Sequence, residues 1–192
     1  MEVPHLTVEN HLSLQEKELL AEFKEPSTKE KAFRKLLEAY QERIYWHVRK
    51  IVITHDDADD VTQEVFIKIY RNLDNFREDS QLFTWIYRIA TNEALNQLKK
   101  IKRRTSVSLD DVHSELENHL THGALISGDE IQMKLQKSLL KLPEKQRLVF
   151  NMKYFDDLKY EEIAEITGTS VGALKASFHL AVKKIELDLN ED

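Results

Sequence analysis

The sequence contains no cysteine, and this absence excludes several kinds of site. Without a thiol among its 192 residues, the chain can form no disulfide, thiolate zinc site or cysteine nucleophile. Glycine and proline are also scarce, with four and three copies. Because these residues end helices and shape turns, their scarcity favours long helices over a β-sandwich or barrel.

Long hydrophobic runs are missing as well. No apolar stretch approaches the length of about 18 residues that is typical of a membrane helix. Residues 1–10 lack the basic start and apolar core of a signal peptide. We therefore expect no direct membrane insertion and a cytoplasmic location.

Charge is abundant but unevenly placed. The chain has 28 basic and 34 acidic residues, 41% hydrophobic and 32% charged residues, which is typical of a soluble globular protein. The six surplus acidic groups all lie in residues 105–130, which contain no Lys or Arg. Gly123 and Gly128 fall in the same stretch, so we interpret it as a linker between two helical domains.

The periodicity of apolar residues predicts an all-α protein. We expect an N-terminal extension (1–26), a first domain (27–104), the acidic linker (105–130) and a second domain (131–192). Ser13 with Glu16 and Ser27 with Glu30 have capping-box spacing, which marks helix starts. Asp56 and Asp57 are suited to the first turn of another helix, a further helix is expected over 82–102, and Pro143 suits the first position of a later one.

Residues 160–185 have the pattern of a helix-turn-helix. Gly168 suits the left-handed end of one short helix, and Thr169 or Ser170 can cap the next. The stretch 170–185 carries Lys175, Lys183 and Lys184 and no acidic residue, as expected for a helix that meets DNA phosphates in the major groove. The alternative is an ordinary helical hairpin.

A second basic segment follows a group of aromatic residues. Residues 86–104 carry six basic side chains and one acidic one, and Phe76, Phe83 and Trp85 lie just before them. Rings that stack on bases beside cations that bind phosphates are typical of single-stranded nucleic-acid binding. The alternative is that the rings belong to the core and the charges to a solvated helix end.

The acidic cluster that contains Asp56, Asp57, Asp59, Asp60 and Glu64 could ligate a cation through Asp60 and Glu64. No matching ligand set occurs elsewhere in the sequence, so a solvated or protein-binding face is the better interpretation. We expect no metal site and no cofactor.

In combination, four segments resemble the bacterial sigma factors of the extracytoplasmic-function group. Residues 59–71 (DDVTQEVFIKIYR) resemble the polymerase-binding helix of sigma region two, and 76–80 (FREDS) with 84–92 (TWIYRIATN) resemble its promoter-melting segment. Residues 142–150 (LPEKQRLVF) and the helix-turn-helix resemble region four. The order of these segments makes the resemblance specific.

The resemblance implies three sets of binding residues and no catalytic residue. The core polymerase would bind Asp57, Asp60, Gln63, Glu64 and Lys68. The −10 single strand would bind Phe76, Arg77, Ser80, Phe83, Trp85, Arg88, Asn92, Asn96, Lys99 and Arg103. The −35 duplex would bind Ser170, Ala173, Lys175, Ser177, His179 and Lys183.

The resemblance also implies a regulatory partner, an anti-sigma factor, and a path for the acidic linker toward the polymerase active centre, where it would mimic RNA. The sequence departs from many relatives at Glu78, where they have glycine, and at Ser177, Leu180 and Val182, where they have arginine. Two other hypotheses are a helix-turn-helix regulator that binds duplex DNA without polymerase, and a metal-dependent nucleic-acid enzyme.

Overall fold

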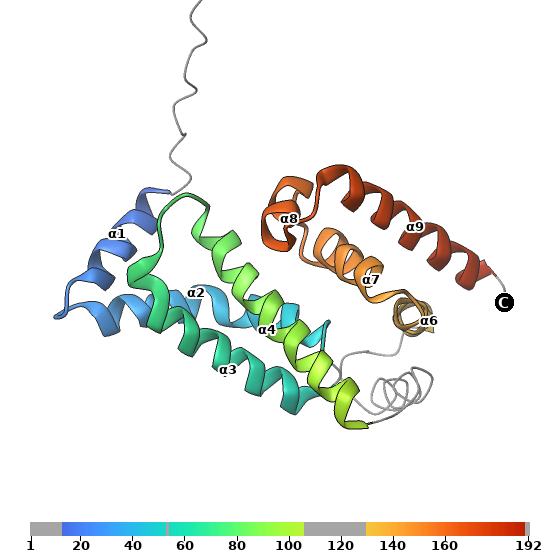
Figure 1. Cartoon of the computed structure of the whole chain (residues 1–192), viewed down its shortest axis with the longest axis horizontal. Coiled ribbons are helices and arrows are strands. Elements are labelled where there is room, and N and C mark those ends of the chain that lie inside the picture. The colour runs from blue at the N-terminus through green and yellow to red at the C-terminus, as the bar shows by residue number, and fades with distance from the viewer. Residues whose placement is uncertain (1–12, 53, 106–129, 191–192) are drawn as a thin grey trace, which may run out of the picture.

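The computed structural model describes residues 13–52, 54–105 and 130–190, and every regular element in these ranges is a helix. Figure 1 shows two groups of helices packed side by side. The elements are α1 (Leu14–Lys24), α2 (Lys29–Arg49), α3 (His55–Asn72), the 3₁₀ turn η1 (Leu73–Asn75), α4 (Leu82–Thr105), α6 (Glu130–Leu140), α7 (Glu144–Phe150), the π-helical turn η2 (Asn151–Phe155), α8 (Tyr160–Thr167) and α9 (Val171–Asn190).

Local hydrogen bonds at the helix starts confirm some predicted caps and correct others. The Ser13 hydroxyl accepts from the Glu16 amide at 3.2 Å, and Glu16 accepts from the Ser13 amide at 2.8 Å, which completes the predicted capping box. The predicted Ser27 cap is wrong, because Thr28 precedes α2 and its hydroxyl donates to the Glu22 carbonyl at 2.7 Å. The Thr28 hydroxyl is therefore bonded to the end of α1 and does not cap α2.

The residues at the starts of α3 and α7 lie at or next to the positions predicted from the sequence. Thr54 caps α3 by accepting from the Asp57 amide at 3.0 Å, and Asp56 and Asp57 lie in the first turn as predicted. Pro143 lies one position before the predicted one, because it is the residue that precedes α7. Its missing N–H costs nothing at either position.

The N-terminal bundle, which we define as α1 to α4, has a core of apolar residues at helical spacing, among them Leu36, Ile44, Ile69 and Ile86. The C-terminal bundle, α6 to α9, has a small core of its own formed by Leu139, Leu142, Phe150, Ala181 and Ile185. Among the described helices, none is both long and apolar enough to cross a membrane.

The two bundles share one continuous hydrophobic core. Val149, Met152, Leu158, Ile163 and Ile166 of the C-terminal bundle belong to the same buried cluster as the core of the N-terminal bundle. Helix α8 packs along α4, and Figure 1 shows it lying between α4 and α9. The predicted pair of helical regions is therefore closed into a single body.

Candidate nucleic-acid interface

The turn between α8 and α9 has the geometry of a helix-turn-helix. Gly168 ends α8 in the left-handed region at φ 67°, and its amide donates to the Ala164 carbonyl at 2.9 Å. The Ser170 hydroxyl accepts from the Ala173 amide at 3.4 Å, so Ser170 is the cap at the start of α9. Ile166 and Leu174 are buried on either side of the turn and fix the angle between the helices.

The outer face of α9 is open to solvent. The predicted −35 residues Ser170, Ala173, Lys175, His179 and Lys183 are exposed, and Ser177 is half-buried. The Lys175 ammonium lies 5.7 Å from the centre of the Tyr160 ring on α8, which holds this cation beside the turn. The structure therefore brings this predicted set together on one accessible helix.

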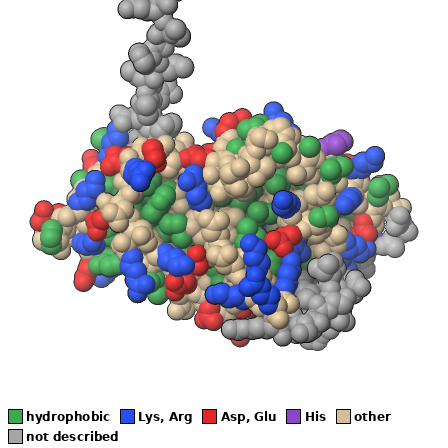
Figure 2. Space-filling model, in the orientation of Figure 1, with side chains coloured by type: hydrophobic (Ala, Val, Ile, Leu, Met, Phe, Trp, Pro, Cys, Tyr) green, Lys and Arg blue, Asp and Glu red, His purple; other side chains and the backbone are tan. Residues whose placement is uncertain are grey.

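The predicted −10 set is divided between surface and core. Asn92, Asn96, Lys99 and Arg103 are exposed along α4, and Figure 2 shows basic side chains gathered over its C-terminal half. Arg77 is exposed in the loop before α4, whereas Phe76 and Ser80 are buried with exposed fractions of 6% and 7%. As the chain stands, Phe76 and Ser80 are not available for the direct DNA contacts predicted from sequence.

The aromatic residues at the start of α4 pack against other rings and are also partly exposed to solvent. The half-buried Trp85 packs on Phe76 with ring centres 5.3 Å apart. Phe83 is also half-buried, lies 4.6 Å from the Tyr87 ring and faces the Arg43 guanidinium at 5.4 Å. The two interpretations drawn from the sequence, core packing and base stacking, are thus compatible for Phe83 and Trp85.

The loop before α4 contains a strained residue. Glu78 adopts φ 60°, a region that glycine enters at little cost and other residues rarely adopt. The Glu78 carboxylate lies 3.5 Å from the Lys24 ammonium, an exposed pair that contributes little.

Helix α3 presents part of its predicted polymerase set to solvent. Asp60, Gln63 and Glu64 are exposed, and Ile67 continues the same face with 44% of its surface exposed. Asp57 and Lys68 are engaged inside the N-terminal bundle, since Gln97 donates to Asp57 at 2.8 Å and Lys68 pairs with Glu93 at 2.6 Å. Sequence reasoning missed Ile67, whose exposure departs from the apolar pattern of α3.

Arg88 is not free for DNA in this structure. One of its terminal nitrogens lies 3.9 Å from a carboxylate oxygen of Glu165 on α8. Its Nε is buried and donates to no acceptor among the described residues. The contact is half-exposed, so it contributes about 1 kcal/mol or less.

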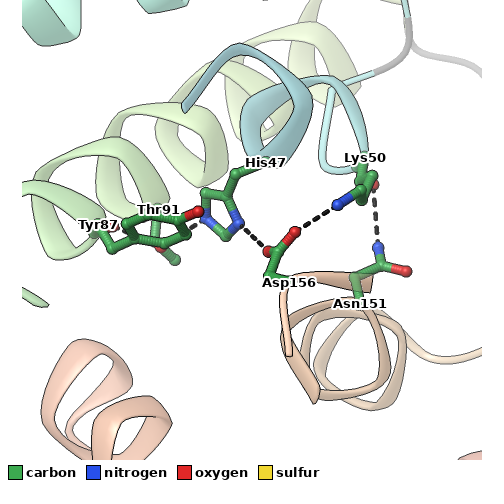
Figure 3. A network of polar contacts seen from close by, with 6 residues as sticks. All are labelled: His47, Lys50, Tyr87, Thr91, Asn151 and Asp156. Atoms are coloured by element: carbon green, nitrogen blue, oxygen red, sulfur yellow. Dashed lines mark hydrogen bonds and ion pairs between the residues drawn. The ribbon is translucent and has the colours of Figure 1, made fainter. Parts of the chain in front are cut away.

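A buried polar network joins the two bundles, and sequence reasoning missed it (Figure 3). The Asp156 carboxylate accepts from Nδ1 of His47 at 2.8 Å and also pairs with the Lys50 ammonium. Nε2 of His47 lies 2.9 Å from the Thr91 hydroxyl, whose proton is donated to the Tyr87 carbonyl at 2.7 Å. Both ring nitrogens of His47 therefore have partners, and the ring links Asp156 of the C-terminal bundle to Thr91 on α4.

Burial alone would raise the pKa of Asp156, but hydrogen bonds and charges from His47 and Lys50 outweigh it and hold the pKa below its ordinary value. His47 is 1% exposed, so the pair is removed from water. A second link, Lys102 to Glu144 at 2.6 Å, is partly exposed. No sequence pattern connects His47 with Asp156, since the two lie 109 positions apart.

Two predictions concern other parts of the chain. Within 13–52, 54–105 and 130–190, no group of three or more potential ligands could hold a metal ion. The acidic linker lies almost wholly in 106–129, outside the described residues.

Two family models match the chain. The one described as Sigma-70 region 2 matches residues 36–104, and the one described as Sigma-70, region 4 matches residues 132–185. The chain is 37% identical over 167 residues to the ECF RNA polymerase sigma-E factor of Escherichia coli strain K12, a match that covers 82% of the chain and 86% of that protein. It is 30% identical to the ECF RNA polymerase sigma factor SigW of Bacillus subtilis strain 168, over 83% of the chain and 90% of that protein.

Two solved structures share the fold. The sigma factor RpoE of Bartonella quintana, solved with the anti-sigma factor NepR, is 23% identical with a TM-score of 0.64, covering 84% of this chain and 99% of that one. CnrH, solved with the cytosolic domain of CnrY, is 21% identical with a TM-score of 0.67, covering 92% and 97%.

Proposed function

Since the chain belongs to the extracytoplasmic-function group of bacterial sigma factors, we propose that three separate surfaces carry out its work at the promoter. The chain is an alternative sigma factor, which directs RNA polymerase to initiate transcription. Its partners are core RNA polymerase and promoter DNA. The assignment of particular residues to each partner is the substance of the proposal.

The polymerase binds the α3 outer face, defined as Asp60, Gln63, Glu64 and Ile67. Gln63, Glu64 and Ile67 follow Asp60 by three, four and seven positions, so the four residues share one side of the helix. An exposed isoleucine among carboxylates fits an interface with an apolar centre and a polar rim.

This assignment is tested by Ile67→Glu. We expect at least a tenfold loss of affinity for core polymerase, measured by competition binding, because the charge would be buried in the contact. The matched control is Leu187→Glu, which places the same charge on an exposed apolar residue of α9, where 56% of the surface is exposed against 44% for Ile67. An equal loss with both variants, or a loss with neither, would remove the α3 outer face from the proposal.

The −35 duplex binds α9, and the −10 single strand binds α4. On α9, Lys175 and Lys183 contact phosphates while Ser170 and His179 face base edges.

On α4, Trp85 and Phe83 stack on unpaired bases, and Asn92 and Lys99 contact the strand. Captured bases offset unpairing, which costs a few kcal/mol per base, so the chain needs no reaction chemistry of its own.

The observation that carries this proposal is the coexistence of the α8–α9 turn with a separate basic, aromatic helix in one chain that matches both sigma regions. A helix-turn-helix regulator that binds duplex DNA alone has no use for α4 and the α3 outer face. The proposal further places the chain in the cytoplasm, with an anti-sigma factor as the third partner, as NepR is in the structure of the Bartonella quintana sigma factor. The acidic linker is proposed to mimic RNA, and replacing its six acidic residues should weaken initiation.

The deciding experiment adds the purified chain to core polymerase and maps transcripts from the source genome, with other sigma factors omitted. We expect specific start sites that require the chain. Tight sequence-specific binding to duplex DNA with no polymerase-dependent transcript would favour the stand-alone regulator. Cation-dependent nicking of supercoiled DNA would favour the nuclease hypothesis.

A further inference from the structure

The seam between the two bundles is held at one point by a buried carboxylate. Asp156 follows the π-helical turn and inserts between His47 and Lys50 on the end of α2, as Figure 3 shows. The Asn151 side chain adds a hydrogen bond to the Lys50 carbonyl at 3.3 Å. One turn of the C-terminal bundle thus meets one turn of the N-terminal bundle through three directional contacts.

The shape of the chain around Asp156 is specific to this contact. Asp157 adopts φ 53°, and the Leu158 amide returns to the Met152 carbonyl at 3.0 Å, so the backbone reverses sharply at Asp156. Strained residues of this kind persist where the surrounding structure holds them. Here the reversal aims the Asp156 carboxylate at the buried His47 ring and at the partly exposed Lys50 ammonium.

Closure at this point places α8 on the helix that we assign to the −10 strand. Glu165 of α8 faces Arg88 of α4, and the Nε of the same guanidinium has no acceptor among the residues that the structure describes. Through His47, the network also reaches Thr91, which precedes Asn92. A carboxylate here occupies the position beside Arg88 that a DNA phosphate would take.

The closed arrangement cannot bind both promoter elements at once. Elements named −10 and −35 lie roughly 25 base pairs apart, about 85 Å along B-form DNA. In the closed chain α8 packs against both α4 and α9, so about one helix diameter, 10–12 Å, separates the two DNA helices where α8 crosses them. The bundles must separate before both elements can be bound.

We infer that Asp156 is the latch of an autoinhibited state in which α8 covers α4 and Glu165 stands in for phosphate on Arg88. This inference rests on the proposed function of α4, but the latch itself is a property of the free chain. Removing the Asp156 carboxylate shifts the free chain from the closed to the open state, and the open chain binds single-stranded DNA better.

The first test measures the distance between the bundles. Because the chain has no cysteine, Glu38→Cys on α2 and Glu186→Cys on α9 provide two unique labelling sites on exposed positions. We expect high energy transfer in the parent and a fall in the closed-to-open ratio of at least about tenfold with Asp156→Ala, because a buried ion pair loses one partner. Unchanged transfer would overturn the latch.

The matched control for this test is Asp157→Asn. It removes one negative charge from the neighbouring exposed residue, and asparagine tolerates a positive φ. Energy transfer should stay at the parent value. A fall equal to that of Asp156→Ala would mean that charge in this turn, and not the buried contact, sets the distance, which would overturn the assignment to Asp156.

The second test measures affinity for a fluorescein-labelled single strand of 20 random nucleotides, with no polymerase present. We expect Asp156→Ala and Glu165→Gln each to raise the affinity severalfold, whereas Glu161→Gln on the exposed side of α8 leaves it unchanged. If Asp156→Ala opens the chain but its affinity for the single strand does not rise, the inference that α8 masks α4 is overturned. Circular dichroism melting confirms that each variant keeps its helices.

The two levels of the hypothesis fail in different ways. If the chain proves not to act with polymerase, the reconstituted transcription assay fails while the distance change with Asp156→Ala remains. If the latch is absent, transcription succeeds and the distance change is missing.

Discussion

Helices α9 and α4, the two DNA helices of the proposal, differ in how they meet the rest of the molecule. The predicted DNA residues of α9 face solvent except for the half-buried Ser177, and they lie on a helix of the C-terminal bundle alone. On α4, Arg88 is paired with α8, and two residues of the preceding loop are buried. The chain therefore leaves the proposed −35 surface open while it covers part of the proposed −10 surface.

The two helices differ in exposure because α4 lies at the contact between the bundles, whereas the outer face of α9 points away from it. Helix α8 has an acidic first turn and a buried apolar side, and it uses both bundles to bury that side. Helix α9 packs against α6, α7 and α8, which leaves its outer face free. All residues of a proposed DNA surface can thus be present in the sequence while the other bundle covers part of that surface in the folded chain.

The largest effect is expected when the seam loses its histidine. In His47→Ala, the buried Asp156 carboxylate keeps only the partly exposed Lys50 as a charged partner, and the free energy of unfolding should fall by about 3 kcal/mol. Urea denaturation followed by tryptophan fluorescence measures this change. His179→Ala, on the exposed face of α9, should change stability by less than about 0.5 kcal/mol; equal losses would contradict a special role for His47.

Trp85→Ala separates the two roles of the aromatic residues on α4. Loss of a half-buried ring that packs on Phe76 should cost about 2 kcal/mol of stability. At a temperature where the variant stays folded, open-complex formation should fall more than polymerase binding. Permanganate footprinting and competition binding measure the two steps, and equal losses in both would leave only the core role.

Stability should have an acid and an alkaline limit that arise near the seam. The pKa of Asp156 is lowered, so its contribution is present above about pH 4 and is lost as pH falls through the folded-state value. Burial raises the pKa of Tyr87 to about 12, so its contribution is present below about pH 10 and is lost as pH rises toward 12. Melting curves should show both limits, and Asp156→Asn should flatten the acid one only.

Salt dependence compares the open and the covered helix directly. Lys183→Ala should reduce the log–log slope of duplex binding by about 0.9 in the free chain, because one phosphate contact is lost. Arg88→Ala should leave the slope for single-stranded DNA unchanged, and should reduce it by about 0.7 only when Asp156 is also replaced. A reduced slope for Arg88→Ala in the closed chain would mean that Arg88 is not covered.

The smallest effect concerns the loop before α4. Glu78→Gly should raise the free energy of unfolding by about 0.5–1 kcal/mol, because glycine adopts a φ of 60° without strain. The loss of the exposed pair with Lys24 should offset only a few tenths of this gain. Urea denaturation tests it, and a decrease in stability would show that the Glu78 side chain matters more than its backbone.

Much of the local structure was predictable because its signals act over three or four residues. The Ser13 capping box, the acidic first turn of α3 and the left-handed Gly168 all depend on neighbours in sequence. The Ser27 cap failed because a competing local bond formed at Thr28. The burial of Phe76 and the exposure of Ile67 were missed, since both depend on which side of a helix or loop meets another element.

By itself the sequence determined the helices, the turn that orients α9 and the placement of basic residues on two of them, because hydrogen bonds and periodicity within a few residues encode these features. Only the tertiary structure decided which surfaces stay open. The contact of Asp156 with His47 joins residues 109 positions apart, and its stability comes from removing both from water together. That depends on how whole helices pack, which no local pattern records.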